Sequence, residues 1–450
     1  MGKHKPLLLL CLTPFFLIRT CYAQDKWDLR RCVDYAIANN ISVKQADIQA
    51  RQYKLSYDQA RLSQIPTLAG SVGGSVNSGH TQNPTTYQLN TVTSFYSNIG
   101  VQAGVTVFNF SSLRNLIESD RLSWQAYLAN SEKTKNDLTL NVANAYLGVL
   151  LQIEATQTAE SQLHLSQSNL DLTRKQVNAG TLPELNAAEL ESQVSQDSAT
   201  YISSKGQINL DLLNLKAYMG MDAAEPFDIT TPPVEDIPVE NIADLQPDIV
   251  YAMALVSQPA QRMDSLLIAA IRRDVRAISA GRFPTVTMGG GLSSTYFKYS
   301  NIPADKYFTQ INNNFAQSVG ININIPILNG GALRTNYEKS KLNLQNGLLA
   351  RDQDNLTLKQ NIYMAYTAAM TALQKFEANK ISVAASEKSY LFAKKRYDVG
   401  MLNTIDLLTN QNNFFSARIN LLTSQFDYVF KMKILEYYKG LGVKLTKGGN

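Results

Sequence analysis

Cysteine and histidine are scarce in this chain, and their scarcity excludes several kinds of function. The 450 residues include three cysteines and three histidines. Two of these cysteines and one histidine lie within residues 1–23, so only Cys32, His80 and His164 remain downstream. One thiol cannot form an intramolecular disulfide, and Cys32 is far in sequence from both histidines, so a zinc site or a catalytic triad lacks its parts. We therefore expect no enzyme, no metal site and no cofactor.

A long apolar run is missing downstream of the N-terminus. Residues 1–23 have the basic, apolar and small-residue regions of a secretory signal peptide, with cleavage expected after Ala23. Acylation at Cys21 is the alternative, but Arg19 stands where a lipoprotein signal needs a small, uncharged residue. No later run reaches 18 apolar residues, so no membrane-spanning helix is expected. A soluble exported protein and a membrane β-barrel, whose strands alternate, both fit this pattern.

The chain also lacks an excess of positive charge. Removal of the signal takes three basic residues from the 42 in the chain and leaves 39 against 37 acidic residues, a net charge of +2. A nucleic-acid-binding protein would carry a strong basic excess. We therefore expect no nucleic acid partner.

An internal repeat with one constant offset organises the chain. The matching positions are Ile99-Gly100-Val101 with Val319-Gly320-Ile321, Asn109 with Asn329, Ala145-Tyr146 with Ala365-Tyr366, Gly180 with Gly400, and Tyr218 and Gly220 with Tyr438 and Gly440. A constant offset over so many positions indicates two copies of one structural unit. We predict a first repeat over 24–220, a second over 248–443, and a tail over 444–450.

Each repeat is predicted to begin with a helix that a proline ends, at Pro66 and at Pro284. A pair of strands follows, within 67–109 in the first copy and within 285–328 in the second, because apolar residues alternate there with glycine, asparagine and serine. Each strand can extend for about 10 residues, as a tilted membrane strand requires. Aromatic residues gather towards the loop ends, as an interfacial girdle would: Phe95, Tyr96, Tyr296, Phe297, Tyr307 and Phe308.

Proline is absent from 110–177, and this absence predicts one very long helix with coiled-coil spacing of its apolar residues. Such a helix would be about 100 Å long. The second copy should repeat it over 331–397, and shorter return helices are predicted over 185–217 and 405–438. The return helix of the first copy and the pre-strand helix over 248–282 together match the long helix in length. We expect these two to stack end to end beside it.

The two repeats are joined by a segment without any basic residue. Residues 221–247 contain five of the 14 prolines and seven acidic residues. Prolines at this density prevent regular helix or sheet. We predict an irregular, acidic belt that crosses the helices.

Four membrane strands are too few to close a barrel. An open sheet edge in lipid leaves backbone groups unpaired at a cost of several kcal/mol each, so the chain must associate with copies of itself. Two copies would supply eight strands around a lumen filled by side chains, and three would supply twelve strands around a water-sized lumen. The fold class predicted is therefore mixed: long α-helices combined with a membrane β-sheet that only the oligomer closes.

Several of these features together resemble the outer membrane efflux protein family, the TolC-like exit ducts of Gram-negative bacteria. They are the opening helix from Trp27 to Pro66, the strand from Val319 to Leu328, the two Ala-Tyr pairs, and RYDVGMLNTIDLL from Arg396 to Leu408. The resemblance covers residues 25–443. It implies a homotrimer with a 12-stranded β-barrel in the outer membrane lipid, continued by a 12-helix α-barrel in the periplasm. It also implies docking to a periplasmic adaptor and an inner-membrane transporter.

Two functions from different classes are compatible with the pattern. One is the channel of a tripartite efflux or type I secretion system, which would pass small molecules such as drugs to the exterior. The other is a coiled-coil structural or adhesive protein of the periplasm or cell surface, which has no use for paired strands at two equal offsets. The sequence does not distinguish drug, metal and protein cargo, because cargo choice lies largely with the pump.

One short turn motif occurs twice in the sequence, as QVNAGTLPELNAA around Gly180 and as RYDVGMLNTIDLL around Gly400. Glycine at the end of a long helix is typical of a C-cap in the left-handed conformation. The resemblance implies that these turns are also the periplasmic tips where the adaptor docks, together with Arg396 and Tyr397.

Asp406 is the candidate gate residue. As an acid in the first turn of the return helix it would interact favourably with the helix dipole, behind a cap at Thr404. The resemblance places it in the constriction of the duct, where three like charges would select cations.

The chain departs from some members of the family around this gate. Those members carry an arginine two residues after the glycine and a second aspartate three residues after the first, where this chain has Leu402 and Thr409. The position matching Asp406 in the first copy is Asn186. We therefore do not expect a salt-bridge latch of that pattern, and a plug formed by Leu402 with Leu182 is the alternative gate.

Overall fold

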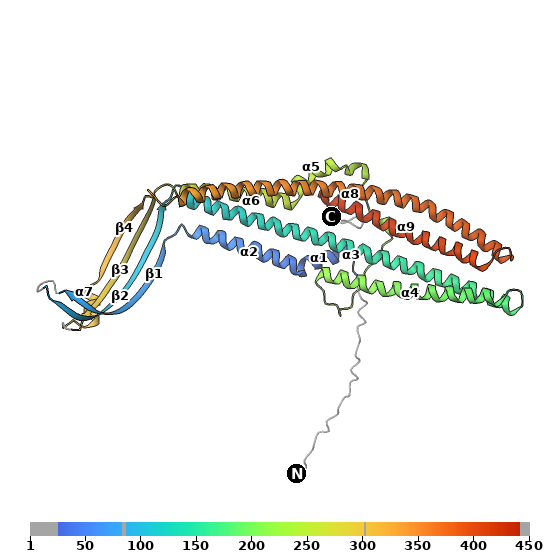
Figure 1. The fold of residues 1–450 in the computed structure, drawn as a ribbon, viewed down its shortest axis with the longest axis horizontal. Coiled ribbons are helices and arrows are strands. Elements are labelled where there is room, and N and C mark those ends of the chain that lie inside the picture. The colour runs from blue at the N-terminus through green and yellow to red at the C-terminus, as the bar shows by residue number, and fades with distance from the viewer. Residues whose placement is uncertain (1–25, 83–86, 301–302, 442–450) are drawn as a thin grey trace, which may run out of the picture.

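The computed structural model describes residues 26–82, 87–300 and 303–441. The predicted signal peptide over 1–23 and the tail over 444–450 lie outside this range. The molecule is elongated, with a β-sheet at one end and two helical hairpins at the other (Figure 1). Among the described residues, no helix combines the length and apolar character that crossing a membrane requires.

Four strands form one antiparallel sheet in the order β1-β2-β3-β4. They are β1 (Thr67–Gln82), β2 (Leu89–Phe108), β3 (Thr285–Tyr299) and β4 (Ala316–Asn324). The first three contain 16, 20 and 15 residues and are longer than the predicted 10. The last was predicted to reach residue 328 but ends where its partner β3 begins, at the Thr285–Asn324 pair. A short helix, α7 (Tyr307–Asn313), in the β3–β4 connection was not predicted.

The register gives the sheet one apolar and one polar face. Directly opposed residues of an antiparallel pair point to the same side of the sheet. Successive rows alternate in character: Val105, Met288 and Ile321 form one row, and Gly104, Gly289 and Gly320 form the next. The apolar side chains are exposed, with Val72 at 79% and Val319 at 78%. An apolar face of this kind needs lipid or another protein surface to cover it.

Two long helices leave the sheet, α3 (Ser112–Asn178) and α8 (Ala332–Asp398), each of 67 residues. They return as α4 (Glu184–Met219) and α9 (Thr404–Lys439), each of 36 residues. These bounds lie within two residues of the predicted ones. Both helices of the second copy start and end at the offset that relates Gly400 to Gly180, so the sequence repeat is also a structural repeat.

The helices before the strands differ from the prediction. Each was expected to be continuous, but each is broken once, into α1 (Leu29–Asn39) and α2 (Ile41–Leu62) and into α5 (Pro247–Ser257) and α6 (Pro259–Ala280). Asn40 is extended and its side chain caps α2 by accepting from the Ser42 amide. In the second copy, Pro259 has no amide hydrogen and disfavours helix at the preceding residue, so Gln258 is extended.

The helices in the half of the molecule nearest the sheet repeat the order of the strands (Figure 1). Helix α2 packs against α3, α3 against α6, and α6 against α8, so that α2 and α8 are the two edges of the layer. In the half nearest the hairpin tips, α4 packs against α3 and α9 packs against α8. The expected stacking of α4 with the pre-strand helix of the second copy is wrong, because α4 contacts α1 and α9 contacts α5. Each return helix therefore stacks on the pre-strand helix of its own copy.

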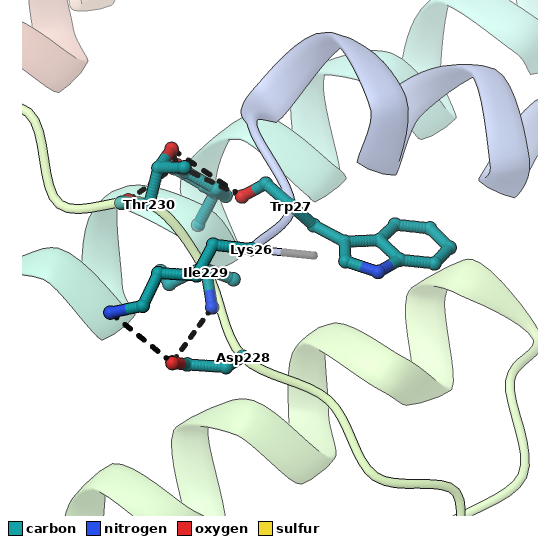
Figure 2. Close-up of polar contacts among 6 residues, drawn as sticks. Lys26, Trp27, Asp228, Ile229 and Thr230 are labelled. Carbon is teal, nitrogen blue, oxygen red and sulfur yellow. Dashed lines mark hydrogen bonds and ion pairs between the residues drawn. The ribbon is translucent and has the colours of Figure 1, made fainter. Parts of the chain in front are cut away.

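The segment between the repeats is irregular, as predicted, apart from two short 3₁₀ turns (Val234–Asp236 and Ile242–Leu245). It is hydrogen-bonded to the start of the chain, where the Trp27 amide donates to the Asp228 carbonyl (3.0 Å) and the Thr230 amide to the Trp27 carbonyl (2.9 Å). The Lys26 ammonium pairs with the Asp228 carboxylate at 3.4 Å (Figure 2).

The repeated tyrosines also hold this segment. The Tyr146 hydroxyl donates to the Thr230 carbonyl (2.7 Å), and Gln246 Nε2 donates to the Tyr366 hydroxyl (3.3 Å). The Ala-Tyr pairs seen in the sequence therefore have the same role in both copies. They join the belt to the middle of each long helix.

Candidate functional site: the two hairpin tips

The two glycine turns lie at the end of the molecule opposite the sheet (Figure 1). Gly180 and Gly400 have φ angles of +74° and +73°, which confirms the predicted left-handed caps. In each turn the glycine amide donates to the carbonyl three residues back, at 2.9 Å in both copies. The next amide donates to the carbonyl five residues back, from Thr181 to Gln176 and from Met401 to Arg396. This double closure is the Schellman arrangement, which satisfies the last carbonyls of a helix.

Backbone conformation is the reason for glycine at both tips. A Cβ atom added to Gly180 or Gly400 would meet nothing within 4 Å, so crowding does not exclude a side chain. A left-handed φ costs about 1–2 kcal/mol for other L-residues. The cost is highest for β-branched residues and low for asparagine. Substitutions at the tips therefore test conformation separately from packing.

The return helices begin differently in the two copies. Asn403 caps α9, and its Oδ1 accepts from the Asp406 amide at 2.7 Å. The expected cap at Thr404 is wrong: Thr404 is the first residue of the helix and is only 2% exposed. Asn403 is the N-cap because it precedes the first helical residue, and its extended backbone angles let its side chain reach the free amides of the first turn. Pro183 takes this place in the first copy and makes no side-chain cap.

The predicted gate residues lie in and just before the first turns of the return helices. Asp406 is exposed at the third position of α9, and Asn186 is half-buried at the matching position of α4. Leu402 is half-buried and packs against the cluster of Tyr390, Ala393, Tyr397 and Leu407. Leu182 is also half-buried. Within a single chain Leu402 thus already fixes the start of its own helix, in the manner of a hydrophobic staple.

The predicted docking residues divide into surface and interior. Arg396 is exposed, and its carbonyl closes the glycine turn. Tyr397 is 9% exposed, and its hydroxyl lies 3.0 Å from the hydroxyl of Thr173 on α3. Tyr397 therefore lies beneath the tip and links the second hairpin to the first.

A buried polar network also joins the two hairpins, and the sequence reasoning missed it. Gln411 Nε2 on α9 donates to Ser166 Oγ on α3 at 2.7 Å, and Asn169 Nδ2 donates to Gln411 Oε1 at 3.1 Å. Ser166 Oγ in turn donates to the Asp197 carboxylate on α4, which also accepts from Gln193. Each member of such a network depends on the others for its partners. The two hairpins are thus held in one definite arrangement.

Comparison with known proteins agrees with this geometry. The family model described as outer membrane efflux protein matches residues 32–221 and 250–429, which are the two repeats. These segments make up most of the chain.

The chain belongs to the outer membrane efflux protein family.

Its relatives are distant in sequence but alike along most of their length. The chain is 22% identical to the toluene efflux pump outer membrane protein TtgC of Pseudomonas putida over 424 residues, 92% of this chain and 82% of that protein. It is 20% identical to the outer membrane protein TolC of Escherichia coli, over 83% and 74% of the two chains. The CmeC outer membrane channel of Campylobacter jejuni has the same fold, with a TM-score of 0.76 at 17% identity over 93% of this chain and 87% of that one.

Family membership decides between the two classes of function. The chain is an outer-membrane efflux channel of a Gram-negative bacterium, with its sheet in the outer membrane and its helices in the periplasm. The alternative, a structural or adhesive coiled coil, has no support from the relatives. The resemblance that the repeats and the glycine turns indicated is confirmed.

Proposed function

We propose that three copies of this chain form a closed exit duct for small molecules, with its periplasmic entrance at the two hairpin tips. The observation that carries the proposal is the open sheet: within the described residues, β1 and β4 each have one unpaired edge, and one face is apolar while the other is polar. A sheet of this kind is stable in lipid only when its edges meet. Four strands from each of three chains close a twelve-stranded barrel, with the polar face inward.

The duct passes cargo received from an inner-membrane transporter through a periplasmic adaptor. Support comes from the family and from relatives named as toluene and antibiotic efflux pump proteins. The adaptor docks at the exposed surface of the tips, formed by Gly180, Gly400 and Arg396. Tyr397 lies beneath this surface and transmits its position to the first hairpin through Thr173.

The gate lies at the start of the return helices. Asp406 is exposed there, and three copies around one axis would form a ring of negative charge. Leu402 and Leu182 narrow the same level from their half-buried positions, with Asn186 as the uncharged counterpart of Asp406. Charged rings of this kind select ions by sign in other channels. The geometry thus favours a gate that combines an acidic ring with an apolar constriction.

Replacing Asp406 by asparagine is expected to weaken the preference of the channel for cations over anions. The substitution keeps the shape of the side chain and its place in the first turn but removes three charges from the ring. Single-channel reversal potentials in a salt gradient measure the change. The free energy of unfolding should fall by no more than about 1 kcal/mol per chain, because a helix-dipole contribution is that small.

Asp398→Asn is the matched control, because it removes one exposed charge from the end of α8 in the same hairpin. We expect this control to leave the reversal potential unchanged. Equal potentials for Asp406→Asn and the unmodified channel would remove Asp406 from the gate. Absence of channels in preparations of the unmodified protein would contradict the duct itself.

A further inference from the structure

We propose that three aromatic side chains on the polar face of the sheet form an outer constriction of the duct, at the end of the barrel opposite the hairpin tips. They are Tyr96, Phe297 and Tyr299, and we call them the aromatic collar. This inference rests on the proposed function, because it takes the polar face to line the lumen of a ring of three chains. It adds a second selective site to that duct, which sorts molecules by size after they have passed the periplasmic gate.

The aromatic residues near the loop ends divide between the two faces of the sheet. They were expected to form one interfacial girdle, but successive residues of a strand point to opposite faces. Phe95 and Tyr296 lie on the apolar face. Tyr96 is paired directly with Phe297, on the face that carries the glycine row, and Tyr299 follows two residues later on the same face. The collar residues therefore point away from lipid when the polar face is inward.

The collar residues pack against one another and project from the sheet as one group. The rings of Tyr96 and Phe297 meet edge to face with their centroids 6.4 Å apart, and those of Phe297 and Tyr299 are 4.5 Å apart. Phe297 is nevertheless 37% exposed. An exposed aromatic cluster on a polar face is unusual enough to indicate a contact with something that passes or binds there.

Small side chains line the polar face between the collar and the periplasmic end of the sheet. Twelve strands about 4.8 Å apart and tilted by about 40° enclose a cylinder about 24 Å across. Glycine, serine and threonine leave most of this width open, whereas three large rings from each of three copies reduce it. The residues below the collar are Asn98, Gly100, Gln102, Gly104 and Thr106 on β2, and Thr287, Gly289, Gly291, Ser293 and Thr295 on β3.

The collar lies at the level where the apolar band of the outer face ends. Val286 and Tyr296 are the first and last large residues of this band on β3. Their separation of ten residues is about 33 Å along a strand, or about 25 Å across the membrane at the usual tilt. This is the height of the lipid-facing band of an outer-membrane barrel. Phe297 follows directly, so the constriction is at the outer mouth.

The connection through α7 fixes the backbone of the collar. Strand β4 pairs with β3 only as far as Ser293, so the edge of β3 beside the collar has no strand partner in the described part of the chain. Side chains take its place. Gln310 Oε1 accepts from the Phe297 amide at 3.0 Å, and Asn314 Nδ2 donates to the Thr295 carbonyl at 2.7 Å.

Helix α7 itself rests on the opposite, apolar face. The Ser294 hydroxyl donates to the Ile311 carbonyl at 2.5 Å, and the Ser97 hydroxyl lies 3.3 Å from that of Tyr307. Both serines belong to the apolar face by the register, and they are only 4% and 6% exposed. The helix therefore supports the collar from the lipid side and leaves the lumen side free.

The chemistry of the collar predicts a sieve that acts on size and not on charge. None of the four described strands has a charged residue on its polar face, so no charged ring belongs to this level. Apolar constrictions oppose the passage of water and of hydrated solutes when they are narrow. Because hydrogen bonds hold the collar in place, we expect a fixed opening that admits small molecules and excludes bulky ones.

The test measures which thiol reagents reach a cysteine beneath the collar from outside intact cells. Ser293→Cys lies on the polar face, four residues or about 13 Å from Phe297 towards the periplasm. One reagent is a small charged methanethiosulfonate, and the other carries the same group on a rigid β-cyclodextrin ring. We expect the small reagent to label Ser293→Cys and the cyclodextrin reagent to label it at least tenfold more slowly.

The native thiol does not interfere with this measurement. Cys32 belongs to α1, far from the sheet (Figure 1), and is fully buried. Burial, together with the nearby Asp28 carboxylate, raises the pKa of its thiol to about 12. The reactive thiolate is therefore scarce at neutral pH.

Removal of the rings should open the collar. Tyr96→Ser combined with Phe297→Ser is expected to raise the rate at which the cyclodextrin reagent labels Ser293→Cys by at least tenfold. Phe297→Tyr keeps the bulk of the ring and should keep the exclusion. Phe95→Ser is the matched control, because it removes a neighbouring ring from the apolar face, and it should leave the exclusion unchanged.

Two further cysteine positions calibrate the labelling. Gly79→Cys lies on the polar face beyond the collar, and a Cβ atom there would meet nothing within 4 Å. Both reagents should label it in every variant, which shows that the channel has reached the surface. Leu292→Cys lies on the apolar face, where lipid covers it, and neither reagent should label it.

The outcomes separate failure of the collar from failure of the duct. Rapid labelling of Ser293→Cys by the cyclodextrin reagent through the unmodified collar overturns the constriction. Exclusion that persists in the double serine variant also overturns it, since the barrier then lies elsewhere. If Gly79→Cys shows that the double variant is missing from the surface, Phe297→Ser alone makes the same test. Labelling of Leu292→Cys by the small reagent, with none at Ser293→Cys, contradicts the proposed duct itself.

Discussion

Glu436→Ala is expected to lower the free energy of unfolding by about 3–5 kcal/mol per chain, because it leaves a buried ammonium group without its carboxylate. Lys433 and Glu436 are 2% and 4% exposed, and their charged groups are 2.7 Å apart. The other Glu436 oxygen accepts from the Glu240 amide at 2.9 Å. The substitution thus also removes the acceptor that holds the acidic belt against α9.

Unfolding in guanidinium, followed by the fluorescence of Trp27 beside the belt, measures this loss. Lys433→Met combined with Glu436→Ala is the matched control, since it leaves no buried charge unpaired and removes only the partners of the Glu240 amide and the Pro238 carbonyl. We expect the double variant to recover most of the stability that the single variant loses. A single variant as stable as the unmodified chain would show that the pair does not hold the belt.

Gly400→Val is expected to abolish most export while the protein still assembles in the outer membrane. Valine cannot adopt a φ of +73° without a cost of roughly 1–2 kcal/mol, and this strain falls on the tip at which we propose that the adaptor docks. The sheet lies at the opposite end of the molecule and is not affected (Figure 1). Export of a toxic dye by cells that depend on this channel, together with the amount of trimer in their membranes, measures both effects.

Gly400→Asn is the control for this experiment, because asparagine tolerates the left-handed conformation. It should keep export close to that of the unmodified channel. If the valine variant loses its trimer as well as its export, Gly400 is a folding residue and the docking role of the turn is wrong. If both variants export normally, the turn has no role in docking.

The long helices were predictable to within two residues because their physical signals are strong. Proline is absent from α3, glycine follows at the left-handed cap, and the second copy repeats both. A signal that occurs twice at a constant offset is hard to misread. The four strands were predictable for the same reason, since alternation and repetition agree.

The breaks in the pre-strand helices were missed because each depends on a single residue. Asn40 interrupts a continuous apolar pattern through one side-chain hydrogen bond to the Ser42 amide. Pro259 was visible in the sequence, but proline at the start of a helix and proline inside one look alike until the preceding residue is known to be extended. The cap at Asn403 rather than Thr404 was missed for a similar reason, because adjacent residues compete for one position.

The polar links between the hairpins could not be predicted from apolar spacing. Ser166, Asn169 and Gln411 occupy buried positions that a search for apolar seams passes over. Tyr397 looked like a surface residue of the tip, and its contact with Thr173 joins positions 224 residues apart. Partners so distant in sequence are found only when the fold brings them together.

Native mass spectrometry of the protein in detergent tests the central claim most directly, which is that this chain is one third of a closed duct. Neither free edge of the sheet, at β1 or β4, has a partner within the described part of the chain. Exposed apolar residues also recur every seven positions on the edge helices, as Ile41, Ile48, Leu55 and Leu62 on α2 and as Leu342, Leu349 and Leu356 on α8. We expect one dominant species with three times the mass of the mature chain. A dominant monomer or dimer would contradict the account, because neither encloses a water-sized lumen.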